Sequence, residues 1–64
     1  MKRKYYYRIN NGNATLTIND GEKVDHIGKF KTDAEAKRAC DYHHERACVL
    51  AQRFNRPHPE KHFI

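Results

Sequence analysis

One long segment without glycine or proline limits what the rest of this chain can form. It opens at Thr32-Asp33-Ala34-Glu35, a capping box with threonine as N-cap and glutamate at the third helical position. It runs to residue 56, where Pro57 and Pro59 forbid continuation of a helix. We therefore predict one helix from about Asp33 to about Arg53, which leaves residues 1–31 for the elements before it.

The predicted helix carries one less polar stripe. Plotted at 100° per residue, the stripe contains Ala36, Ala39, Cys40, His43, Ala47, Leu50, Ala51 and Phe54. Most charged side chains lie away from it. Because the small residues come first, we expect the helix to lie close against a sheet.

Three segments before the helix have the composition of strands. Tyr5-Tyr6-Tyr7-Arg8-Ile9 is aromatic and β-branched, and it stops at the turn-forming Asn10-Asn11-Gly12-Asn13. Residues 14–18 alternate apolar and polar side chains, and Asp20-Gly21 after them is typical of a tight hairpin. The third segment, residues 24–30, loses its alternation at Gly28, which indicates a bulge or a close backbone approach.

These elements predict an α+β fold of order β-β-β-α, in which a three-stranded antiparallel sheet packs on one C-terminal helix. Residues 1–56 would form a single domain, and residues 57–64 a tail that is either loose or held by Phe63 and Ile64. Alternation directs one set of side chains toward the helix: Tyr5, Tyr7, Ile9, Ala14, Leu16 and Ile18. The opposite face, here called the outer face, carries Lys4, Tyr6, Arg8, Thr15 and Thr17, and no second layer remains to cover it.

Size and charge favour some function classes over others. The 64 residues include 13 Lys and Arg against 8 Asp and Glu, a formal charge of +5, and most of this excess lies in residues 1–31. A basic chain favours acidic partners such as nucleic acid. So small a domain buries only about 60% of its unfolded surface, too little for a deep substrate cleft, so we predict no enzymatic activity.

The sequence also indicates where the protein works. No segment approaches the roughly 20 apolar residues that span a bilayer, and residues 1–6 contain no signal-peptide apolar region. We expect a cytoplasmic protein in a reducing compartment, without a membrane partner.

Cysteine and histidine residues on the predicted helix are candidates for a metal or catalytic site. Cys40, His44 and Cys48 follow each other at intervals of four, but a straight helix brings only two ligands to one metal, and the spacing matches no zinc finger. The two cysteines would lie about 12 Å apart along the helix, too far for a disulfide. Because the chain has no serine and Cys40 is predicted to face the sheet, we expect no catalytic site, no metal and no other cofactor.

The outer face is the strongest candidate for a binding site. Lysine and arginine neutralise phosphates, tyrosine and threonine hydroxyls bond phosphate oxygens, and a two-stranded ribbon fits the major groove of DNA. An ordinary solvated face of an antiparallel sheet has a similar composition, so this alternative stays open. The predicted nucleic-acid-binding residues are Lys2, Arg3, Lys4, Tyr6, Arg8, Thr15, Thr17, Lys23, Lys29 and Lys31.

Residues 26–41 resemble the third strand and early helix of AP2-type DNA-binding domains. The matching positions are Ile27, Gly28, Phe30, Thr32, Glu35, Ala36, Ala39 and Asp41. The order of elements is also similar to that of the N-terminal arm-binding domain of phage and transposon integrases, in which a tyrosine-rich first strand also occurs. The resemblance implies that the sheet enters the major groove with the helix behind it, so that Arg8, Thr15 and Thr17 face DNA. Plant-type AP2 domains carry Trp and several Arg where these strands carry Tyr, Asn and Thr.

The sequence thus favours a small non-enzymatic module that binds double-stranded DNA through its outer face. The alternative is a small phage-type accessory or inhibitor protein that uses the same face on a protein or ribonucleoprotein partner. A homodimer is compatible with both, because two copies would thicken a thin core.

Overall fold

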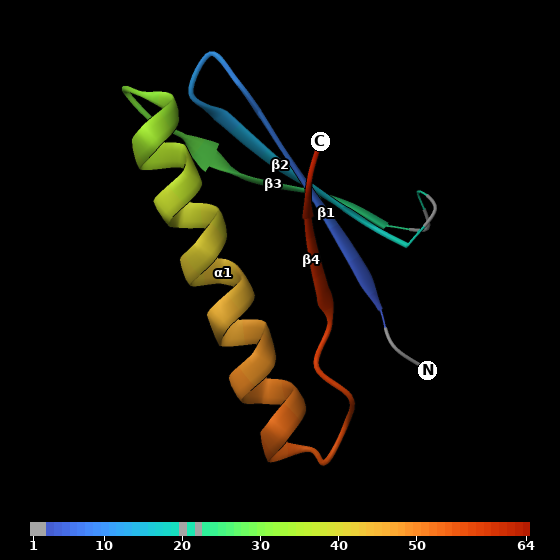
Figure 1. Ribbon diagram of the computed structural model, residues 1–64. Coiled ribbons are helices and arrows are strands. Elements are labelled where there is room, and N and C mark those ends of the chain that lie inside the picture. The colour runs from blue at the N-terminus through green and yellow to red at the C-terminus, as the bar shows by residue number, and fades with distance from the viewer. Residues whose placement is uncertain (1–2, 20, 22) are drawn as a thin grey trace.

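The computed structural model describes residues 3–19, 21 and 23–64. Its elements, in chain order, are β1 (Lys4–Asn10), β2 (Asn13–Ile18), β3 (Lys23–Lys29), α1 (Asp33–Arg53) and β4 (Glu60–Phe63). The strands form a sheet of order β3-β2-β1-β4, and α1 lies over one of its faces (Figure 1). The α+β class and the first four elements are as predicted.

The sheet has four strands, whereas we predicted three. β1 and β3 are antiparallel to β2, but β4 runs parallel to β1, with Lys4 opposite Glu60 and Tyr7 opposite Phe63. The segment expected to be a tail therefore supplies the edge strand of a mixed sheet. The sequence did not show it, because four residues give too short a pattern and the partner strand lies more than fifty positions away.

The β1–β2 hairpin closes through the predicted turn. Asn11 and Gly12 both have positive φ, +50° and +78°, and form the two-residue loop of a type I′ turn. The Gly12 carbonyl accepts a hydrogen bond from the Phe30 amide at 2.8 Å, and the Gly12 amide donates to Asp33 Oδ1 at 2.8 Å. The turn is thereby bonded to the segment that leads into α1.

The irregularity predicted in the third strand is also present. Ala14 pairs with Gly28 while Thr15 pairs with His26, so Ile27 is the extra residue of a bulge. A Cβ atom on Gly28 would lie only 3.0 Å from the Phe30 ring. The bulge is therefore confirmed, and the close approach at this glycine comes from an aromatic side chain and not from backbone.

The core lies between the sheet and the first half of α1. From β1 and β2 it receives the predicted residues Tyr5, Tyr7, Ala14, Leu16 and Ile18, with Ile9 packed at its margin. From α1 it receives Ala36 and Cys40, both fully buried. Because these two side chains are small, the helix can approach the sheet closely here.

The second half of α1 departs from the predicted packing. Leu50 and Phe54 belong to the same stripe as Ala36 and Cys40, yet their side chains are 47% and 63% exposed. Figure 1 shows that the helix diverges from the strands toward its C-terminal end. The stripe is therefore fully buried at Ala36 and Cys40, partly covered at Ala47 and exposed toward its end.

Both ends of α1 are capped by the chain itself. At the start, Thr32 Oγ1 accepts a hydrogen bond from the Glu35 amide, and Glu35 Oε2 accepts one from Lys31 rather than from Thr32. At the end, Asn55 has a φ of +57° and its amide bonds the Gln52 carbonyl, while the Arg56 amide bonds that of Ala51. The second pattern is a Schellman motif, which turns the chain back toward the sheet.

Several contacts hold the returning segment against β1 and α1. His44 Nε2 donates to the carbonyl of the buried Pro59 at 2.9 Å, and Lys61 pairs with Asp41 at 3.0 Å. The ring of Phe63 packs on Tyr7, with 5.8 Å between centroids. Of the two residues expected to hold the tail, Phe63 does so with its side chain, whereas Ile64 donates only its amide, to Tyr7.

Candidate nucleic-acid interface

Cross-strand pairing arranges the outer face in rows. Tyr6 lies opposite Thr17, which lies opposite Val24. In the next row Arg8 lies opposite Thr15, and Thr15 opposite His26. Since successive side chains of a strand alternate between faces, these rows and Lys4 share the face that α1 does not cover.

The outer face is predominantly basic. Lys4, Arg8 and Lys29 are exposed, and Lys29 joins this face because it pairs with Asn13, two positions before Thr15. Among the strand side chains that the structure describes, only Glu60 brings a carboxylate to this face, where it lies 3.4 Å from His62 Nε2. Phosphate groups would therefore meet more cations than anions here.

β4 adds an aromatic contact that the sequence did not reveal. The His62 ring stacks on Tyr6 with centroids 5.1 Å apart and an angle of 23° between the planes. Tyr6 is half-buried, and His62 contacts one face of its ring. If residues 60–63 had been predicted as a strand, alternation would have placed Lys61 and Phe63 on the helix side. His62 between them would then have been assigned to the outer face.

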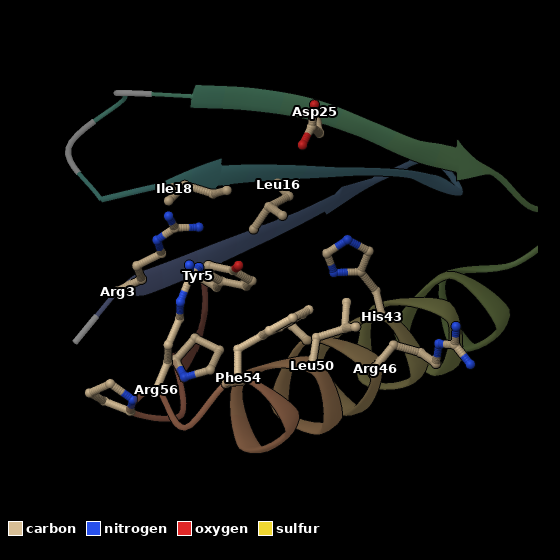
Figure 2. Close-up of a pocket in the computed structure, with 14 residues that line it drawn as sticks. Arg3, Tyr5, Leu16, Ile18, Asp25, His43, Arg46, Leu50, Phe54 and Arg56 are labelled. Carbon is tan, nitrogen blue, oxygen red and sulfur yellow. The ribbon is translucent and has the colours of Figure 1, made fainter. Parts of the chain in front are cut away.

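Two predicted site residues lie outside these rows, and the side chains of two others are not among those described. Arg3 lines a groove on the helix side of the sheet, opposite to the expected face (Figure 2). Lys31 is exposed in the segment between β3 and α1. For Lys23 only the backbone is described, paired with Ile18, and Lys2 lies outside the described residues.

The titratable groups between the sheet and the helix, Tyr7, Cys40 and His43, pack within or beside the core. The Tyr7 hydroxyl lies 3.0 Å from His43 Nδ1, and burial raises the pKa of Tyr7 while it lowers that of His43. The hydrogen bond therefore joins two groups that are both uncharged at neutral pH. Burial also raises the pKa of the Cys40 thiol, which stays protonated at neutral pH and is not activated for nucleophilic attack.

The remaining cysteine pairs with a histidine of the same helix. Cys48 Sγ lies 3.7 Å from His44 Nδ1, which is free to accept because Nε2–H is donated to Pro59. Within residues 3–19, 21 and 23–64, no three His, Cys, Asp or Glu side chains gather as a metal ion would require. Both ring nitrogens of His44 thus have a partner, Nε2 in the chain after α1 and Nδ1 on the helix itself.

Comparison with known proteins gives no relative: no protein-family model, curated protein or solved structure matches this chain. In the described part of the chain, no helix is long and apolar enough to cross a membrane. Any function must therefore be argued from the surface of this molecule.

Proposed function

We propose that this protein is a small non-enzymatic module that binds double-stranded DNA through its outer face. The observation that carries the proposal is the uncovered sheet face, on which Lys4, Arg8 and Lys29 are exposed and Glu60 is the one described carboxylate. The strands hold these cations in fixed register. The resemblance of residues 26–41 to AP2-type domains supports the same conclusion.

The residues would divide into two roles. Lys4 and Lys29, with Lys31 beside the end of β3, bind phosphates and give affinity without sequence preference. Arg8 lies in the middle of β1, where its guanidinium can reach guanine in the major groove, and Thr15 opposite it adds a hydroxyl and a methyl group. Tyr6 and Thr17 occupy the neighbouring row and would hydrogen-bond the DNA backbone.

Salt dependence tests this proposal directly. A fluorescein-labelled random duplex is titrated by anisotropy at several salt concentrations. Three phosphate contacts predict a slope of log K against log salt of about −3. Lys29→Gln should weaken binding and reduce the slope by about 1, whereas Arg8→Gln should weaken binding with a smaller change of slope. Arg38→Gln removes the same charge from an exposed position on α1 and should have little effect.

Sequence selection separates the two roles. Lys29→Gln should weaken binding to all duplexes about equally, whereas Arg8→Gln should flatten the preference found in a duplex selection. Binding without salt dependence, or binding that Arg38→Gln lowers as much as Arg8→Gln does, would contradict the proposal.

One observation favours the accessory-protein alternative on the same face. Val24 is 65% exposed in the row that contains the Tyr6 and His62 stack, so the face also has an apolar and aromatic part that phosphates do not need. A protein or ribonucleoprotein partner would use this part. Retention of a partner after nuclease treatment, and its loss with Val24→Ser, would support the alternative over DNA binding.

A further inference from the structure

A groove with a volume of about 780 Å³ separates the second half of α1 from the helix-facing side of the sheet (Figure 2). Leu16 and Ile18 of β2 form part of one wall, and Leu50 and Phe54 of α1 form part of the other. This volume lies within the range of sites that hold ligands. The groove exists because the helix diverges from the sheet after its small residues end.

The ends of the groove are basic. Its lining includes three arginines, Arg3, Arg46 and Arg56, and one carboxylate, Asp25. Figure 2 shows Arg3 and Arg56 at one end and Arg46 toward the other, with Asp25 on β3. The groove therefore combines an apolar interior with cations at both ends.

We propose that this groove binds a short acidic segment of a partner protein. Apolar side chains of the segment would cover Leu50 and Phe54, and its carboxylates would pair with the three arginines. Arginine suits this role, because its planar guanidinium binds carboxylates in a bidentate manner. The groove lies on the opposite side of the sheet from the outer face, so a bound segment would leave the proposed DNA contact free.

Charge and shape favour this occupant over two others. In a two-fold dimer through the groove, the three arginines of each copy would face those of the other, which is unfavourable. A small apolar molecule would stay largely in water, because Leu50 and Phe54 form an open wall and small-molecule sites bury most of their ligand. A peptide with alternating acidic and apolar side chains can place its apolar groups on the interior of the groove and its carboxylates beside the arginines at the ends.

The test uses the full chain and three short fluorescein-labelled peptides. In the first, Glu alternates with Leu and Phe; in the second, Lys replaces Glu; in the third, Ser replaces Leu and Phe. The first should bind, with amide shifts in an NMR spectrum confined to the groove, and the other two should bind at least about tenfold more weakly.

Matched variants of the protein locate the site. Leu50→Ser and Arg56→Gln should each weaken binding of the first peptide about tenfold. The controls are Val49→Ser, which changes a side chain 52% exposed on the same helix, and Arg53→Gln, because neither residue lines the groove. All four positions are solvent-accessible, so the variants should fold, and their circular dichroism should match that of the parent.

Several results would overturn the proposal. The controls could lower peptide binding as much as Leu50→Ser and Arg56→Gln do, or the Lys peptide could bind equally well. Amide shifts in the groove on addition of duplex DNA would identify nucleic acid as the occupant. A dimer that Leu50→Ser dissociates would identify a second copy. The affinity of Leu50→Ser for duplex DNA should be unchanged. Peptide binding in the groove and DNA binding on the outer face can then fail independently of each other.

Discussion

Replacing Gly12 by alanine should be among the most damaging single substitutions in this protein. Gly12 has a φ of +78°, and a Cβ atom on it would lie 2.1 Å from the Phe30 carbonyl oxygen. Real Cβ atoms do not come closer than 3.0 Å, so the turn or the Phe30 backbone must move by about 0.9 Å. That movement strains two hydrogen bonds of 2.8 Å, from Phe30 to Gly12 and from Gly12 to Asp33.

The expected loss can be built from these parts. The left-handed conformation costs alanine about 1 kcal/mol relative to glycine. Weakening a backbone hydrogen bond costs about 1 kcal/mol, and weakening one to a carboxylate about 1.5 kcal/mol or more. The sum is about 3 to 4 kcal/mol. At about 0.05–0.15 kcal/mol per residue, a chain of this length has only about 3–10 kcal/mol of stability.

Urea denaturation followed by circular dichroism measures this loss. Gly21→Ala is the matched control, because Gly21 has a φ of +84° but, apart from its chain neighbours, no atom of the described residues within 4 Å of the added Cβ. It should therefore lose only the conformational part, about 1 kcal/mol. Equal losses for Gly12→Ala and Gly21→Ala would refute the reasoning, since the close approach to Phe30 would then contribute nothing.

Three further predictions concern other contacts of the core and the chain ends. Because burial lowers the pKa of His43 below its ordinary 6.5, only the unfolded chain takes up this proton readily as the pH falls. Stability should thus be full above pH 6.5 and decline below it, and urea midpoints should show this decline less in His43→Gln, where the partner of Tyr7 no longer titrates. Phe63→Ala should cost about 1–2 kcal/mol in urea denaturation, whereas Ile64→Ala at an exposed side chain should cost under about 0.5 kcal/mol. At the left-handed helix end, Asn55→Gly should be neutral or stabilising and Asn55→Ala should lose about 1 kcal/mol of thermal stability, and the reverse order would contradict the Schellman assignment.

Local sequence determined most of the elements. Thr32 and Glu35 cap the start of the helix, and its bounds Asp33–Arg53 are as predicted, with the end at the Schellman motif before the prolines. Asn11 and Gly12 specify the first hairpin, and alternation along β1 and β2 separates the buried side chains from the outer face. These features depend on neighbours within a few positions, which a sequence displays directly.

The outer face could be predicted in part for the same reason. Lys4, Arg8 and Thr15 lie where alternation placed them. Arg3 lies on the helix side, and because it precedes the first residue of β1, the alternation of that strand did not predict its face. His62 joined Tyr6 only through a strand that was not predicted.

Only the tertiary structure decided where the chain after α1 goes and how far the helix covers the sheet. β4 forms because the Schellman turn, His44 and Tyr7 bring Glu60–Phe63 beside β1, a pairing between distant positions that leaves no local pattern. The apolar stripe of α1 looks uniform in sequence, yet Ala36 and Cys40 are buried while Leu50 and Phe54 line an open groove. An apolar stripe in the sequence indicates which side of a helix is apolar. How much of that stripe the sheet covers depends on the angle between helix and sheet, which is set by packing.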